Sequence, residues 1–192
     1  ALKFLNNFTE WVKYEHKVKA LLNDGRFTVL PVNRKTIEDI YQRKFSSEDE
    51  VRSFLDSLRS NRINPTNSDE FFESQVGNKI ADIFFRPYTR KMWGMDPKYL
   101  TVGVGSRLPV RTNYDDRYFS DSFQALPKKG YKFLIENMLD HKKIKVKLNC
   151  EFNKDMESYY DHSFLCMPID SYFSYKYGKL PYRSIKFENK IS

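Results

Sequence analysis

The sequence has few cysteines and few histidines, and both shortages exclude kinds of site. The two cysteines, Cys150 and Cys166, match neither a CxxC motif nor a zinc-ligand spacing, and one pair is too few for a disulfide scaffold. We therefore interpret both thiols as reduced. The three histidines, His16, His141 and His162, are scattered singly. Because a metal site needs clustered ligands, we expect none in this chain.

Long apolar runs are also missing. No run approaches the roughly 20 residues that a transmembrane helix needs, and no signal-peptide pattern opens the chain. We therefore expect no membrane partner and, given the reduced thiols, a cytoplasmic location. The first residue is Ala1 rather than Met, so we expect a start that was processed or cut.

A dinucleotide-binding glycine motif is the third absence. No GxGxxG follows an expected strand, and the nearest match is GVG at Gly103 to Gly105. That match lies in a proline-flanked loop rich in arginine, with no helix start after it. We therefore expect no complete Rossmann unit in this chain.

The positive charge is concentrated in two places. The net charge is +8, yet residues 1–85 and 119–171 each balance basic against acidic side chains. Residues 86–118 carry seven basic and three acidic residues, and the last 21 residues carry five and one. A localised surplus of this kind indicates an anionic ligand.

The stretch 84–118 combines this charge with aromatic rings. Aromatic faces stack on a nucleotide base, and guanidinium groups make forked hydrogen bonds to phosphates. The candidates for stacking on a base are Phe84, Phe85, Tyr88 and Trp93, and the candidates for binding phosphate are Arg86, Arg90, Arg107, Arg111 and Arg117. An alternative stays open, in which rings at helical spacing form core and the arginines form a solvated face.

Periodicity and turn signals predict an α+β fold. With 40% hydrophobic residues, the chain can bury a sizeable core as one domain or two small ones. Gly77 is expected to interrupt a helix, and Pro87 to kink the next one. We expect helices at residues 4–13, 36–43, 47–59, 68–76, 88–93 and 131–139, and a further helix that begins at residue 78. Ser47 is expected to cap the third of these helices and Ser68 the fourth. We also expect a hairpin at 17–32 and strands at 143–149 and 182–187.

Three motifs resemble a known family in order and spacing: YTRKMWG from Tyr88, SRLPVR from Ser106 and NYDDRYFSDSFQALPKKGY from Asn113. They resemble successive motifs of UDP-galactopyranose mutase, and weaker similarity extends from Phe4 to Glu188. The resemblance implies an isomerase of galactofuranose biosynthesis for cell-surface polysaccharide, which interconverts the ring forms of UDP-galactose. A reduced FAD would act as nucleophile, so no catalytic side chain is implied.

The resemblance also implies which side chains bind the substrate. Positions matching Phe84, Phe85, Tyr88, Thr89 and Trp93 line the UDP pocket in that family, Arg107 matches the lid arginine that closes on the diphosphate, and Tyr118 matches a tyrosine that meets the same phosphates. Arg111 we expect to be structural. The chain departs from the family pattern at Met92, Gly103, Gly105, Lys129 and Met167, and the two glycines predict a looser lid.

The family's N-terminal FAD fingerprint and its C-terminal part have no counterpart here, so the chain resembles the middle of a mutase. We expect it to be inactive alone and to bind no FAD. The resemblance divides it into residues 1–33 (helix and hairpin of the sheet region), 34–100 (helical substrate-binding region), 101–118 (mobile arginine lid) and 119–192 (α+β sheet region beside the helical one).

Two other interpretations remain open. A pI of 9.3 and 16% aromatic residues are compatible with a nucleic-acid-binding module, although two charge-neutral segments separate the basic ones. A degenerate mutase relative with a structural role or a protein partner is the other. The sequence also leaves a homo-oligomer open.

Overall fold

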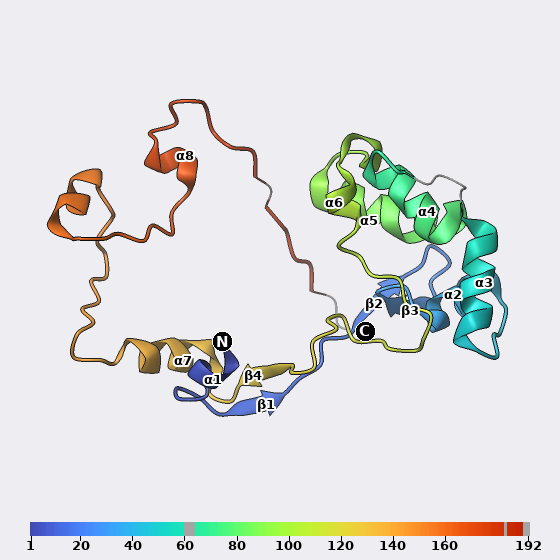
Figure 1. The fold of residues 1–192 in the computed structure, drawn as a ribbon, viewed down its shortest axis with the longest axis horizontal. Coiled ribbons are helices and arrows are strands. Elements are labelled where there is room, and N and C mark those ends of the chain that lie inside the picture. Colours follow the sequence, from blue (N-terminus) through green and yellow to red (C-terminus); the bar gives the residue numbers. More distant parts are fainter. Residues whose placement is uncertain (60–63, 183, 190–192) are drawn as a thin grey trace. The chain divides into compact units, whose positions relative to one another are not determined.

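The computed structural model describes residues 1–59, 64–182 and 184–189. It contains two compact units, residues 1–134 and 135–192. Helices and two small antiparallel sheets are both present, which confirms the predicted α+β fold (Figure 1). Within the described ranges each sheet is a single antiparallel pair, so these residues contain no complete Rossmann unit. None of the helices described is long and apolar enough to cross a membrane.

The predicted hairpin is confirmed and consists of β2 (Val18–Leu21) and β3 (Phe27–Leu30). Val18 pairs with Leu30 and Leu21 with Phe27. Gly25 occupies the turn at φ +85°, a conformation that glycine adopts without steric cost.

The expected helix at residues 4–13 is wrong beyond its first turn. Helix α1 (Leu2–Leu5) is short, and Trp11–Lys13 forms strand β1, which pairs with β4 (Ala125–Pro127). The Trp11 ring also meets Phe123 edge-on, with centroids 5.8 Å apart. Pairing with a distant segment therefore outweighs the helical spacing of the apolar residues.

Two helices follow the hairpin. Helix α2 (Arg34–Tyr41) begins at Asn33, whose side chain accepts a hydrogen bond from the Thr36 amide at 3.1 Å. Helix α3 (Glu48–Leu58) begins at Ser47, whose hydroxyl accepts from the Glu50 amide at 3.1 Å, so the predicted cap is confirmed.

Helix α4 (Ser68–Ile80) has Asn67 as its cap, so the expectation that Ser68 caps it is wrong. The predicted interruption at Gly77 is confirmed, with φ +71° inside the helix. A Cβ on Gly77 would lie 2.5 Å from the Leu58 carbonyl oxygen, so glycine allows α3 to approach the kink.

A π-helical turn follows, η1 (Ala81–Phe85), and leads into α5 (Arg86–Trp93). The ring of Pro87 disfavours an α-helical turn back to Ile83, which explains why the chain widens just before it. The 3₁₀ turn η2 (Pro97–Tyr99) and helix α6 (Val102–Gly105) follow in the larger unit. Helix α7 (Gly130–Leu139) begins in the larger unit and ends in the smaller one.

The hydrophobic core of this unit lies among β3, α2, α3, α4 and η1. Phe72 of α4 stacks on Phe85 of η1 with centroids 4.9 Å apart. The buried core side chains are Val32, Ile37, Ile40, Phe45, Val51, Leu55, Phe72, Val76, Ile80, Ala81, Phe84 and Phe85.

Residues 135–192 hold η3 (Lys154–Tyr159) and α8 (Ile169–Tyr172). The strand expected at residues 143–149 is wrong, and none forms at 182–187 in the part described, which omits Arg183. Alternation of apolar and polar residues favours a strand only where a neighbour pairs with its backbone. Apolar side chains here are consequently exposed, as Leu148 (81%) and Phe187 (81%) show.

Candidate functional site

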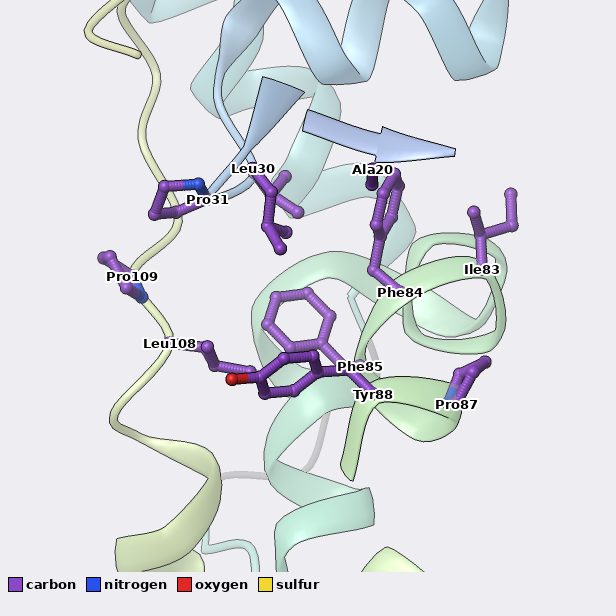
Figure 2. A pocket seen from close by; sticks show the side chains of 11 residues that line it. Ala20, Leu30, Pro31, Ile83, Phe84, Phe85, Pro87, Tyr88, Leu108 and Pro109 are labelled. Atoms are coloured by element: carbon purple, nitrogen blue, oxygen red, sulfur yellow. The ribbon is translucent and has the colours of Figure 1, made fainter. Parts of the chain in front are cut away.

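A cavity of about 160 Å³ lies at the edge of the hydrophobic core in the larger unit (Figure 2). It forms where the hairpin, the junction of η1 with α5, and the segment after α6 meet. Its lining residues are Ala20, Leu30, Pro31, Val32, Ile83, Phe84, Phe85, Pro87, Tyr88, Leu108 and Pro109. The first four come from the hairpin and the two residues after it, the next five from η1 and α5, and the last two from the lid segment.

Two of the predicted rings are both core and cavity wall. Phe84 and Phe85 are 6% and 4% exposed, and both line the cavity. The π-helical turn positions them, and stacking on Phe72 holds Phe85 in place. The core interpretation and the pocket interpretation of these rings are therefore compatible.

Tyr88 adds a hydroxyl to this apolar wall. Figure 2 shows the hydroxyl turned toward Leu108. Burial, and then the neighbouring Tyr118 hydroxyl, raise the pKa of Tyr88 above its ordinary value. The Tyr88 hydroxyl therefore stays protonated at neutral pH and can donate to an anionic oxygen.

Tyr118 is placed by the segment before the hairpin. Its amide donates to the His16 carbonyl oxygen at 2.7 Å, and the two rings meet edge-on at 5.5 Å. Tyr118 does not itself line the cavity, but it is a neighbour of Tyr88, which does.

Arg86 is not available for a ligand, which corrects the expectation that it binds phosphate. Its side chain is 11% exposed and forms ion pairs with Asp69, Glu73 and Asp82. The hydrogen bond to Asp69, followed by those to Asp82 and Glu73, raises the pKa of Arg86 despite burial. This arginine joins α4, η1 and α5 and is structural.

Arg90 and Arg117 also have acidic partners. Arg90 pairs with Asp96 at 2.8 Å, and Arg117 pairs with Asp115 at 2.9 Å. The hydrogen bond from Arg117 holds the pKa of Asp115 well below its usual range. The expectation that these two arginines act as phosphate forks is therefore not supported by the geometry.

Arg111 has the structural role that we expect for it. Its guanidinium donates to the carbonyl oxygens of Asp115, at 3.1 Å, and Arg117. Its backbone amide donates to the Val32 carbonyl oxygen at 2.9 Å. Arg111 thereby fixes the end of the lid segment against the hairpin.

Arg107 differs from the other four arginines. Its side chain is exposed and makes no hydrogen bond or ion pair with any residue that the structure describes. The two residues that follow it, Leu108 and Pro109, line the cavity. A free guanidinium therefore lies next along the chain to the cavity wall, where it can meet an anion.

The lid segment is anchored at both ends. Ser68 is fully buried; its hydroxyl donates to the Thr101 carbonyl oxygen at 2.6 Å and accepts from the Gly105 amide at 3.1 Å. At the other end, the Arg34 amide donates to the Asn113 carbonyl oxygen at 2.9 Å. Arg107 lies between these anchors.

Gly105 lies in a helical turn that the sequence did not predict, and the looser lid stays a prediction. It ends the four-residue helix α6, where no helical period was expected, and it is buried. A Cβ at this position would lie 2.9 Å from the Phe72 ring, so glycine permits close packing here. Whether the rest of residues 101–118 is mobile stays a prediction.

A buried carboxylate, Glu38, is hydrogen-bonded to the lid segment through Tyr114. The Glu38 side chain is 1% exposed and accepts hydrogen bonds from Lys44, Tyr114, Arg34 and the Phe45 amide. Burial raises its pKa, but these bonds outweigh burial and hold the pKa at about 2. The bond from Tyr114 connects α2 to the residues after the lid arginine.

Thr89 and Trp93, like Arg107 and Tyr118, were predicted as site residues but do not line the cavity. Thr89 is 3% exposed and lies on α5, and Trp93 is 41% exposed at the end of that helix. Sequence reasoning missed the hairpin residues of the wall. The apolar run Leu30 to Val32 was a signal, but nothing local shows that it meets α5.

Within the described residues, no group of three His, Cys, Asp or Glu side chains is arranged to hold a metal ion. The chemistry that the site offers comes instead from rings, hydroxyls and a guanidinium. Such a set suits a ligand with a flat ring and a negatively charged group.

Comparisons with known proteins give the family. The sequence pattern of UDP-galactopyranose mutase matches residues 83–192. A Klebsiella pneumoniae protein described as "Probable UDP-galactopyranose mutase" is 38% identical over 186 residues, which are 96% of this chain and 48% of that protein. The dTDP-fucopyranose mutase of Escherichia coli is 36% identical over 199 residues, 98% of this chain and 52% of that protein.

A more distant relative has the same proportions. The UDP-galactopyranose mutase of Mycoplasma pneumoniae is 27% identical over 214 residues, 98% of this chain and 51% of that protein. The chain thus spans about half the length of the curated relatives it matches. Because the family pattern covers more than half of the chain, the chain belongs to the UDP-galactopyranose mutase family.

Proposed function

We propose that this chain supplies the nucleotide-binding part of a flavin-dependent isomerase that interconverts UDP-galactopyranose and UDP-galactofuranose. The observation that carries the proposal is the position of Arg107. Of the five arginines in residues 86–118, it alone lacks a hydrogen bond or ion pair to a described residue, and it directly precedes two cavity-lining residues.

The base of the nucleotide would enter the cavity beside Phe84 and Phe85. The diphosphate would then lie near the Tyr88 and Tyr118 hydroxyls, with Arg107 closing over it. Hydroxyl and guanidinium donors stabilise the negative charge that gathers on UDP as its bond to the sugar breaks. Since the donors are held in place before reaction, they cost little reorganisation.

The described residues contain no dinucleotide-binding unit of the Rossmann type. Both sheets are antiparallel pairs, and no strand leads through a glycine-rich turn into a helix that could hold a pyrophosphate. We therefore limit the mechanism to the nucleoside diphosphate. We also propose that the 192-residue chain alone retains no flavin and has no isomerase activity.

The alternative of a nucleic-acid-binding module is not supported. A nucleic-acid surface needs a row of free cations. Among residues 86–118, Arg86, Arg90 and Arg117 are paired with carboxylates, and Arg111 is bonded to carbonyl oxygens. The cytoplasmic location and a homo-oligomer remain predictions from the sequence.

Titration calorimetry of the chain with UDP tests the proposal. Arg107→Ala should weaken UDP binding roughly 10- to 150-fold, since a hydrogen bond to a charged group contributes about 1.5–3 kcal/mol. Arg107→Lys should recover part of the loss, because an ammonium cannot make the forked contact.

Arg52→Ala is the matched control. Arg52 is an exposed arginine on α3, which contributes no residue to the cavity. Its loss changes the net charge equally and should leave UDP affinity within about twofold of the parent. If Arg107→Ala and Arg52→Ala bind UDP equally well, Arg107 is not the phosphate ligand and the proposal is wrong.

A further inference from the structure

Residues 111–117, which follow the lid arginine Arg107 closely, are bonded to one another. The Arg111 guanidinium donates to the carbonyl oxygens of Asp115, at 3.1 Å, and Arg117. The Arg117 guanidinium in turn donates to the Asp115 carboxylate at 2.9 Å. This stretch, which we call the 111–117 loop, is therefore held together as one block.

Two side chains of the 111–117 loop donate hydrogen bonds to carboxylates on helices. Thr112 donates to Glu48 of α3 at 2.9 Å, in an exposed position. Tyr114 donates to Glu38 of α2 at 2.8 Å, and the Glu38 side chain is 1% exposed. A hydrogen bond to a buried carboxylate is stronger than one that water surrounds. The Tyr114 hydroxyl is therefore the stronger of these two attachments.

Arg34 contacts both partners of the Tyr114 hydrogen bond. Its Nε lies 3.2 Å from the Glu38 carboxylate, and its guanidinium carbon lies 4.6 Å from the centre of the Tyr114 ring. The ring is thus held over Arg34 by a cation–π contact that does not need the hydroxyl. The hydroxyl adds the bond that ties the loop to Glu38.

The two donors on either side of the 111–117 loop differ in how they are held. Tyr118, which follows the loop, has an anchor of its own, because its amide donates to the His16 carbonyl oxygen at 2.7 Å. The Arg107 side chain, which precedes the loop, has no such anchor among the residues that the structure describes. A change in the attachment of the loop should therefore affect the position of Arg107 more than that of Tyr118.

We propose that Tyr114 is a positioning residue for Arg107. Its bond to Glu38 fixes the 111–117 loop, and the loop fixes where the Arg107 guanidinium meets the diphosphate. A donor that is held in place before binding loses less freedom when the anion arrives. The proposal rests on the proposed function, since it takes Arg107 as the diphosphate ligand.

Tyr114→Phe is a mild substitution. Without the Tyr114 hydroxyl, Glu38 still accepts hydrogen bonds from Arg34, Lys44 and the Phe45 amide, so no buried acceptor loses all its donors. The ring also keeps its contact with Arg34. We therefore expect the variant to fold, which urea unfolding can verify.

Titration calorimetry with UDP tests the proposal on the parent, Tyr114→Phe, Arg107→Ala and the double variant. Tyr114→Phe should weaken UDP binding roughly 2- to 12-fold, the net effect of one hydrogen bond. In the Arg107→Ala background the same substitution should change UDP affinity by less than about twofold, because the side chain that it positions is gone. A purely structural role of Tyr114 would lower UDP affinity equally in both backgrounds.

Tyr41→Phe is the matched control. Tyr41 ends α2, which contributes no residue to the cavity, and its hydroxyl makes no hydrogen bond with a described residue. The variant loses a hydroxyl from a tyrosine in the same way and should bind UDP within about twofold of the parent.

The outcomes separate this proposal from the proposed function. If the parent binds UDP and Tyr114→Phe binds it equally well, Tyr114 does not position Arg107, and the proposed function stands. If Tyr114→Phe weakens UDP binding to the same extent with and without Arg107, Tyr114 does not act through Arg107, and the proposal is again wrong. If the parent binds no UDP, the proposed function fails and this proposal fails with it.

Discussion

Adding one methyl group at Gly105 tests whether the start of the lid is held by packing. The structure places a Cβ at this position 2.9 Å from Cε1 and 3.3 Å from Cζ of Phe72, and 3.3 Å from the ring of Phe71. Phe72 cannot easily move, because it is 1% exposed and stacked on Phe85. Forcing extra volume into a packed core costs about 1–3 kcal/mol.

Gly103 provides the matched control, two residues earlier in the same helix. A Cβ on Gly103 has the Thr101 hydroxyl at 4.0 Å as its nearest neighbour, which is open space. Neither glycine has a positive φ, so alanine removes chain entropy from the unfolded state in both variants, a gain of about 0.4–1 kcal/mol each. This gain cancels in the comparison, which leaves the packing cost alone.

Urea unfolding of both variants measures the difference. Gly103→Ala should equal or exceed the parent in its free energy of unfolding, and Gly105→Ala should fall about 1–3 kcal/mol below Gly103→Ala. For a chain of this length the gap corresponds to roughly 2–12 °C in the thermal midpoint. If the two variants unfold at the same urea concentration, α6 is not packed on Phe72 as the structure shows.

Three further predictions follow from the site. Trp93 ends α5, the helix that carries the cavity-lining Tyr88, so its fluorescence should change with UDP and not with uridine, which lacks the diphosphate; the change should be lost in Trp93→Phe but kept in Trp11→Phe. Glu38→Gln should lower the free energy of unfolding by about 1.5–3 kcal/mol at neutral pH. The pKa of Glu38 in the folded protein is about 2, below its ordinary 4.5, so the carboxylate stabilises the fold above pH 4.5 and this stabilisation is lost as pH falls toward 2. Acid unfolding of the parent and the variant measures the difference. In a protein completed to the length of its relatives and loaded with reduced flavin, Arg107→Ala should lower kcat/KM roughly 30- to 1000-fold. Arg111→Ala should lower the thermal midpoint more than the rate. If Arg111→Ala is the slower enzyme at equal stability, the assignment of Arg107 as the diphosphate ligand is wrong.

Local signals predicted the elements whose cause is local. The hairpin was predicted at residues 17–32, the start of α3 from Ser47, and the interruption of α4 from Gly77, and all three are present. Strand β1 was missed because its partner, β4, lies far along the chain. The strands expected after residue 140 failed for the related reason that alternation supplies a face but no partner.

In the cavity too, residues with local signals were predicted and residues placed by tertiary packing were not. Phe84, Phe85 and Tyr88 were singled out from the sequence, and the structure places all three in one wall. Their role in binding UDP remains a prediction. The facing wall from Ala20 to Val32 comes from a hairpin that sequence reasoning treated only as part of a sheet, because its contact with α5 is set by tertiary packing.

The arginines show how far charge alone can be interpreted from a sequence. Asp82 lies four residues before Arg86, one helical turn away, so a local pair was foreseeable for Arg86. Arg90 and Arg117 likewise have an aspartate within six residues that binds them. Arg107 has no acidic residue within seven positions on either side. Its isolation from carboxylates is thus encoded locally, and that isolation leaves it the guanidinium best able to bind a diphosphate. The structural role of Arg111 was not encoded in this way, because its acceptors are carbonyl oxygens that only the folded loop places within reach.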